Sequence, residues 1–236
     1  LATPPPAAGA QVAVPLVVQH SRSAVKAFAE RVARSVERKP RDASGHIGLR
    51  KITIGRSRPG HRLDVTAARK LVDDALDDPT KPKVLHQAVT PWRPSVNAND
   101  LRKRWSTVVT VDKSAFKLRL FKNLKVVKTY GVAVGQPAYP TPSGLFSITN
   151  KQVNPTWSVP NSPWAGELQG TTVEGGSAAN PLKARWMGIV NGVGIHGTGE
   201  DYSIGSRASH GCIRMHVPDV IALFSRVPVG TPVLLQ

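Results

Sequence analysis

Two histidines, one cysteine and one arginine lie close together near the C-terminal end of the sequence. His196 lies 16 residues before Cys212, and His210 lies two residues before it. A thiol attacks a carbonyl carbon well only as a thiolate, and a nearby imidazole can take its proton and later return it to the leaving amine. These residues predict a cysteine acyl-transfer enzyme with Cys212 as the nucleophile and His196 as its base.

Acyl transfer also builds negative charge on the carbonyl oxygen, which backbone N–H groups can stabilise. Gly211 directly precedes the cysteine, so the backbone can turn tightly there and approach the substrate. The amides of His210, Gly211 and Cys212 are therefore the expected donors. Arg214 can bind a substrate carboxylate or hold the loop through carbonyl contacts.

The motif resembles a known catalytic signature. The run His196-Gly-Thr198, followed by Ser209-His-Gly-Cys-Ile-Arg-Met215, is similar to that of the L,D-transpeptidases of bacterial cell walls, the YkuD-type catalytic domain. The resemblance covers residues 106–236 and implies a mainly β, β-sandwich-like domain with one main helix near its C-terminus. Further segments resemble the family: Thr141-Pro142, Gly144-Leu-Phe-Ser-Ile148, Asn154-Pro-Thr-Trp157 and Arg185-Trp-Met187.

The resemblance also implies a mechanism. Cys212 would form a thioester with the L-centre carbonyl of a diamino acid in a peptidoglycan tetrapeptide stem, and the terminal D-alanine would leave, protonated by His196. An amine of a second stem would then take the acyl group and cross-link the wall. Water or a protein lysine as acceptor would instead give L,D-carboxypeptidation or protein anchoring. Carbapenem β-lactams are expected to acylate the same cysteine, and no metal or organic cofactor is needed.

The resemblance assigns roles around this pair. His210 is expected to orient the loop, and the Gly197 carbonyl to orient the imidazole. The expected catalytic residues are Cys212, His196, His210, Gly211 and Gly197. The expected substrate-binding residues are Arg214, Ser209, Tyr202, Trp186, Met187 and Thr198.

The same residues are also compatible with functions other than L,D-transpeptidation. His196, His210 and Cys212 could supply three zinc ligands, although the usual CxxC or HExxH spacing is absent. Papain-like and NlpC-like hydrolases place cysteine before histidine, and sortases separate the two much farther, so order and spacing disfavour both classes. A non-catalytic wall-binding protein is the alternative of a different class.

The net charge of +17 predicts an anionic neighbourhood. Residues 1–105 hold 20 basic and 9 acidic residues, so the first part is the better candidate for a module that faces a polyanion. No helix-turn-helix, zinc-finger or RNP-like signature points to nucleic acid. Teichoic acids or other anionic wall polymers account for the charge as well.

The resemblance to a cell-wall enzyme implies the compartment, and simpler features of the sequence agree with it. No run of 18 apolar residues occurs, so no transmembrane segment is expected, and a single cysteine permits no intrachain disulfide. The sequence starts at Leu1, and residues 1–11 resemble a flexible spacer, as expected of a chain that has lost a signal peptide or anchor. An extracytoplasmic location in the cell wall or periplasm is expected, with tethering by an N-terminal segment as an option.

The first half of the chain is expected to form a small α+β module over residues 12–90, which resembles the peptidoglycan-binding module often found before this catalytic domain. A linker is expected over residues 91–105. Apolar spacing predicts two helices, the second capped by Asp64. The expected elements are an apolar segment over 12–18, helices over 21–38 and from 65, and strands over 47–54 and 83–89.

The catalytic domain is expected over residues 106–236. Alternation of polar and apolar residues predicts strands, with Asn123 in the turn between the second and third. The stretch 150–186 has little periodicity and many Pro and Gly residues, as in a functional loop. Strands are predicted over 108–111, 117–121, 125–134 and 230–235, and a helix over 218–227.

Overall fold

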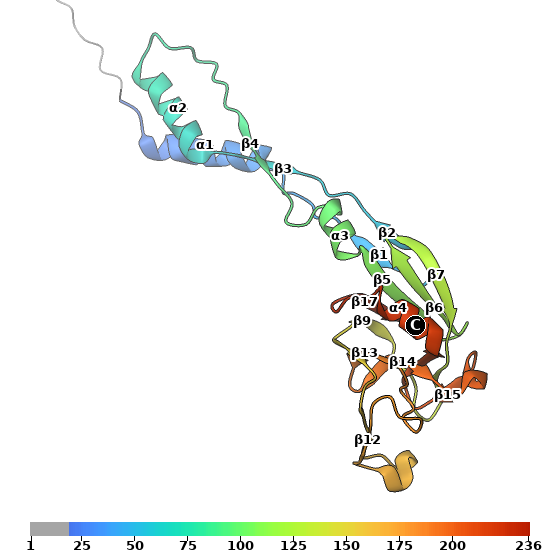
Figure 1. The fold of residues 1–236 in the computed structure, drawn as a ribbon. Helices are drawn as coiled ribbons and strands as arrows, with labels where there is room; N and C mark the ends of the chain where they lie inside the picture. Colours follow the sequence, from blue (N-terminus) through green and yellow to red (C-terminus); the bar gives the residue numbers. More distant parts are fainter. Residues whose placement is uncertain (1–18) are drawn as a thin grey trace, which may run out of the picture. The chain divides into compact units, whose positions relative to one another are not determined.

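The computed structural model describes residues 19–236 (Figure 1), and these divide into two compact units. The first holds the described residues up to Arg41 together with Arg58–Ser95, and the second holds Asp42–Ser57 and Val96–Gln236. The expected spacer over 1–11 and the apolar segment over 12–18 lie outside the described residues. None of the helices in residues 19–236 is both long and apolar enough to cross a bilayer.

The first unit is built on two helices that pack against each other. The side chain of Ser21 accepts a hydrogen bond from the amide of Ala24, and that of Asp64 accepts one from Ala67, so both helices begin at a capping residue. The predicted Asp64 cap is confirmed. The helices and strands of this unit are α1 (Arg22–Val36), β3 (Gly60–Leu63), α2 (Val65–Asp77) and β4 (Val89–Trp92).

The strand predicted over residues 83–89 is wrong. The antiparallel partner β3 is only four residues long, and its register with β4 starts at the Leu63–Val89 pair, so residues before Val89 have no strand to join. Lys83 instead turns its ammonium back to the Ala75 carbonyl at 2.6 Å. The segment expected as a linker also holds structure, because helix α3 (Ala98–Arg104) lies within it.

The strand predicted over 47–54 is a hairpin of two short strands, β1 (Gly45–Ile47) and β2 (Ile52–Ile54). Ile47 and Ile52 pack with Val108 and Phe121, so this hairpin belongs to the core of the second unit. The segment is alternately apolar and was therefore expected to be a strand, but sequence position placed it with the first unit.

The second unit contains two sheets. The five-stranded sheet has the order β7 (Lys125–Gly131), β6 (Lys117–Lys122), β5 (Thr107–Asp112), β17 (Pro232–Leu235), β9 (Gly144–Ser147). The four-stranded sheet has the order β10 (Asn150–Val153), β13 (Arg185–Val190), β14 (Val193–Thr198), β16 (Ile213–His216). Two short pairs complete it: β8 (Val134–Gly135) with β15 (Arg207–Ser209), and β11 (Trp157–Ser158) with β12 (Thr172–Val173).

One core joins the two sheets and helix α4 (Val217–Phe224). Fully buried aliphatic side chains come from all three, and their removal from water supplies most of the stabilisation of this unit. The expected mainly β, sandwich-like domain with one main helix near its C-terminus is confirmed. Asn123 lies in the β6–β7 turn, as predicted, and has a positive φ of 50° there. Representative core residues are Val109, Leu118, Met187, Ile195, Ile213, Val220 and Leu223.

Candidate active site

Three adjacent strands of the four-stranded sheet present Trp186, His196 and Arg214 side by side. His196 on β14 lies opposite Trp186 on β13 and opposite Arg214 on β16. Cys212 directly precedes β16. All four line one cavity of about 410 Å³, so the sheet register brings the predicted nucleophile and base to the same space.

His196 is held as a neutral base. The residue is 4% exposed, and its Nδ1 lies 2.6 Å from the Gly197 carbonyl oxygen. A carbonyl can only accept, so Nδ1 carries the proton and Nε2 keeps its lone pair. Burial lowers the pKa of His196 to about 4, opposed by the Gly197 hydrogen bond and assisted by the Arg214 charge.

The ring of Trp186 forms the wall behind this imidazole. The two rings are stacked, with centroids 6.1 Å apart and planes 23° apart, and the indole N–H donates to Asn150 Oδ1 at 3.0 Å. A Cβ on Gly194 would lie 2.6 Å from the indole ring. Gly194 therefore lets the indole lie flat on the sheet beside the base.

Cys212 faces the cavity with its thiol protonated. Its Sγ lies 3.7 Å from the Gly192 carbonyl oxygen. Burial raises the pKa of Cys212, while the backbone of Gly194 and the Arg214 charge oppose this rise. The cavity thus holds a neutral thiol and a neutral imidazole, and a thiolate must be generated by proton transfer between them.

The loop before Cys212 is held by two hydroxyls. Ser209 Oγ donates to the Cys212 carbonyl at 2.6 Å and accepts from the Gly211 amide at 3.2 Å. Thr141 Oγ1 donates to the Gly211 carbonyl at 2.8 Å and accepts from the Gly135 amide at 2.8 Å. Gly211 has a φ of +111°, a conformation that favours glycine. These bonds fix the peptide planes around the nucleophile.

His210 is part of the cavity wall. Its ring stacks on Trp164 with centroids 4.1 Å and planes 11° apart, and its centroid is 5.0 Å from that of Tyr139. Trp164 in turn stacks on Trp157 at 6.4 Å. Burial lowers the pKa of His210, with the Arg214 charge acting in the same direction. The ring therefore joins the loop of Cys212 to the segment 155–182.

That segment, which we call the lid, is closed by one buried amide. Asn180 Nδ2 donates to the carbonyls of Pro155, Val173 and Glu174 at 2.8, 3.2 and 3.1 Å, and its Oδ1 accepts from the Leu182 amide at 2.9 Å. The lid also contains the 3-10 helix η1 (Pro163–Leu168). A single side chain thus holds the two ends of the long irregular stretch together.

Only part of the expected substrate-binding set lines the cavity. Trp186, Ser209 and Arg214 do, and Arg214 Nη1 also pairs with Glu200 Oε2 at 2.6 Å. The other three lie elsewhere. Met187 alternates with Trp186 along β13 and is buried in the core, Thr198 Oγ1 accepts from the Glu200 amide at 3.0 Å, and Tyr202, in the 3-10 helix η2 (Asp201–Ser203), is 86% exposed.

Sequence reasoning missed Thr141 and Asn180 as positioning residues. Thr141 stands in the Thr-Pro pair that carries part of the family resemblance, which was a usable signal. Asn180 has only an Asn-Pro step to mark it. Within residues 19–236, no three His, Cys, Asp or Glu side chains gather in a way that could hold a metal ion, so the zinc alternative has no ligand set there.

Comparison with known families matches both halves of the chain. Residues 106–235 match the family described as L,D-transpeptidase catalytic domain, and residues 6–85 match the one described as "Putative peptidoglycan binding domain". The first match covers more than half of the chain.

Individual proteins are also similar. "Putative L,D-transpeptidase YqjB" of Bacillus subtilis (strain 168) is 41% identical over 54% of this chain and 69% of its own length. "Putative L,D-transpeptidase YkuD" of the same organism is 40% identical over 54% of this chain and 65% of its own length. The solution structure of the catalytic domain of the E. faecium L,D-transpeptidase is 32% identical over 55% of this chain and 96% of that one, with a TM-score of 0.45.

Proposed function

This chain belongs to the YkuD family of L,D-transpeptidases, a family of cysteine acyltransferases. On that basis we propose that Cys212 takes an acyl group from one peptidoglycan stem and passes it to a second stem. The observation that supports this proposal most strongly is the cavity shared by Cys212 and His196, whose Nε2 is free to accept a proton.

The first half of the reaction forms a thioester. Sγ of Cys212 attacks the L-centre carbonyl of the diamino acid in a tetrapeptide stem, and its proton passes to Nε2 of His196. The imidazolium is stabilised because its Nδ1–H already donates to the Gly197 carbonyl. The C–N bond to the terminal D-alanine then breaks, and His196 returns the proton to the departing amine.

The oxyanion of each tetrahedral intermediate needs donors close to Cys212. The amide of Gly211 already donates to Ser209 Oγ, so we remove it from the three oxyanion donors that the sequence predicted. The amides of His210 and Cys212 remain as the donors that we assign to this task. Arg214, positively charged at the cavity wall, is assigned to a carboxylate of the substrate.

In the second half, an amine takes the acyl group. A side-chain amine of a second stem, deprotonated by His196, attacks the thioester, and the thiol is released as the cross-link forms. Carbapenems are expected to acylate the same sulfur. We place this reaction outside the cytoplasm, at the cell wall or in the periplasm, where stems are found.

The test is mass spectrometry of products formed by the full chain from purified sacculi. We expect released D-alanine and dimers linked between the third residues of two stems. Monomers shortened by D-alanine alone would identify water as the acceptor, and a stem joined to a protein lysine would identify protein anchoring. Either product as the main one would replace cross-linking as the function.

A matched pair of variants tests the nucleophile. Cys212→Ala is expected to abolish both D-alanine release and the mass increase caused by a carbapenem. Tyr202→Phe alters an exposed side chain outside the cavity and is expected to leave both within about twofold, as most surface changes do. Acylation that survives in Cys212→Ala would contradict the mechanism.

A further inference from the structure

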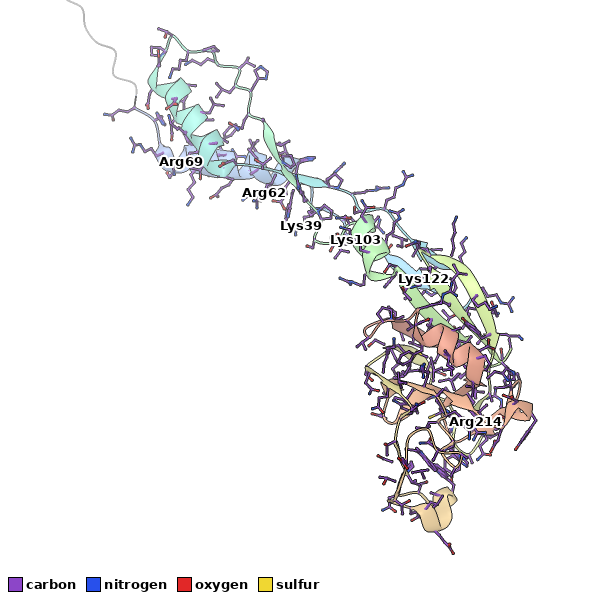
Figure 2. All side chains as sticks on the ribbon, viewed as in Figure 1. Lys39, Arg62, Arg69, Lys103, Lys122 and Arg214 are labelled. Carbon is purple, nitrogen blue, oxygen red and sulfur yellow. The ribbon has the colours of Figure 1, made fainter. Side chains whose placement is uncertain are left out.

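A ribbon of extended backbone in the first unit carries cations without any carboxylate. Isolated antiparallel bridges join Arg38 to His61 and Arg41 to Arg58, and β3 continues from this pairing to β4. We call residues 38–41, 58–63 and 89–93 the basic ribbon. Its six cations are all exposed, and Lys39 and Arg62 are labelled in Figure 2. They are Arg38, Lys39, Arg41, Arg58, Arg62 and Arg93.

These cations do not hold the ribbon together. Its strands are joined by backbone hydrogen bonds, such as those between the amide and carbonyl groups of Arg41 and Arg58 at 2.9 and 2.8 Å. This pairing sets two positive side chains directly opposite each other, an arrangement that destabilises a pair of strands. Stability of the fold therefore gives no reason for arginine at both positions.

The ribbon is not neutralised by neighbouring acids. Among the described residues, none of its six cations lies within 4.0 Å of a carboxylate oxygen. Two acidic residues of this unit, Glu37 and Asp64, flank the ribbon in the sequence, and Asp64 caps α2. Acidic residues in the C-terminal half of α2 are engaged there: Asp73 with His20 at 2.8 Å, and Asp74 with Lys70 at 2.7 Å. The positive charge of the ribbon is thus open to a ligand.

The chemistry of the ribbon suits a phosphate group. Five of its six cations are arginines, whose planar guanidinium donates two parallel hydrogen bonds to phosphate oxygens. Arg62 also lies over the ring of Trp92 at 5.7 Å, which keeps one guanidinium close to the strand surface. Cations spaced along two strands suit a linear chain of charges better than a single anion.

We propose that the basic ribbon binds a phosphodiester polymer of the cell wall and so holds the enzyme among its substrates. The choice of a wall polymer rests on the proposed function, whereas the surface is independent of it. Such binding is electrostatic, so it weakens as salt displaces the protein from the phosphates.

The experiment measures sedimentation of the full chain with Gram-positive sacculi, before and after hydrofluoric acid removes their phosphodiester polymers. Cys212→Ala is the background, so the sacculi stay unmodified. We expect binding to fall by far more than tenfold after the acid treatment, and by about 10³-fold with a rise in NaCl from 50 to 200 mM if all six cations contact phosphates. Undiminished binding to stripped sacculi would overturn the proposal and assign the binding to peptidoglycan itself.

A pair of double variants separates the ribbon from net charge. Arg41→Gln/Arg58→Gln is expected to weaken binding to intact sacculi about tenfold, since two phosphate contacts are lost. Arg22→Gln/Lys26→Gln removes the same charge from exposed positions of α1 and should stay within about twofold. Equal losses in the two would overturn the proposal. D-alanine release from a soluble tetrapeptide by the Cys212 forms of both should be unchanged, and its absence in every protein would count against the proposed function alone.

Discussion

Thr141 Oγ1 donates a hydrogen bond of 2.8 Å to the carbonyl oxygen of Gly211, the residue directly before the nucleophile. That carbonyl belongs to the same planar peptide unit as the N–H of Cys212. A bond that fixes one end of the plane also fixes the direction of the other. Thr141, 71 residues away in the sequence, therefore orients an amide that we assign to the oxyanion.

Thr141→Val should lower kcat because it removes this bond while keeping the shape of the side chain. We expect a loss of about 10- to 100-fold in kcat, less than deletion of an oxyanion donor causes, with KM changed by less than about threefold. Steady-state D-alanine release from a soluble tetrapeptide measures both.

Thr141→Ser is the control for this change, since its hydroxyl can make the same two bonds. It loses only a methyl group and should retain kcat within about threefold, because the buried partners stay paired. Urea unfolding gives the free energy of unfolding of each variant and so separates a loss of stability from a loss of amide orientation. An unchanged kcat in Thr141→Val, or an equal loss in Thr141→Ser, would show that the bond does not orient the amide.

The central pair of the site could be predicted because its residues are close in sequence and chemically distinctive. Cys212 and His196 were named from residue type and spacing alone, and the motif around them led to the family. The sandwich-like fold followed from the resemblance of that motif to the family, whereas individual strands were predictable from local patterns. Apolar alternation and turn residues such as Asn123 are local signals, and they correspond directly to strands and turns in the structure.

The parts that could not be predicted depend on contacts between distant residues. Asn180 acts through backbone carbonyls, which leave no mark on the sequence. Met187 and Tyr202 are close in sequence to motif residues, but neither side chain lines the cavity. Met187 points into the core because side chains alternate along the strand, and Tyr202 points into solvent. The hairpin that contains Ile47 and Ile52 joined the second unit because its apolar side chains complete a core whose other residues lie more than 50 positions away.

His196 predicts a pH dependence of stability. Its pKa is about 4 in the folded chain, against 6.5 for an ordinary histidine. Between these values the unfolded chain binds a proton that the folded chain does not, so the free energy of unfolding falls as pH drops from about 6.5 to about 4. The full contribution is about 3 kcal/mol and is present above pH 6.5. Urea unfolding across this range measures it.

His196→Gln removes the titrating group and can still donate a hydrogen bond to the Gly197 carbonyl. The stability difference between the unaltered protein and this variant should be constant above pH 7 and change by about 3 kcal/mol toward pH 4. A difference that stays the same at every pH would mean that this imidazole titrates normally in the folded chain.

His210 should be replaceable by another flat ring because it contributes a stack and not a proton. His210→Phe keeps a ring against Trp164, and we expect kcat/KM to stay within about threefold. His210→Ala removes the stack, worth about 0.5–1.5 kcal/mol, and should raise KM about 3- to 10-fold. His196→Gln should lower kcat by about 100- to 10,000-fold. If His210→Phe loses as much as His196→Gln, His210 is the base.

Asn180→Ala should open the lid, because the carbonyls of Pro155, Val173 and Glu174 lose their common donor. Each buried polar group left without a partner costs about 1–3 kcal/mol, so amide exchange in the segment 155–182 should be faster than in the unaltered protein. Hydrogen exchange with mass spectrometry measures this. Asn161→Ala, an exposed asparagine of the same segment, should exchange as the unaltered protein does. Exchange that is equally slow in both variants would mean that the lid is held by its tryptophans alone.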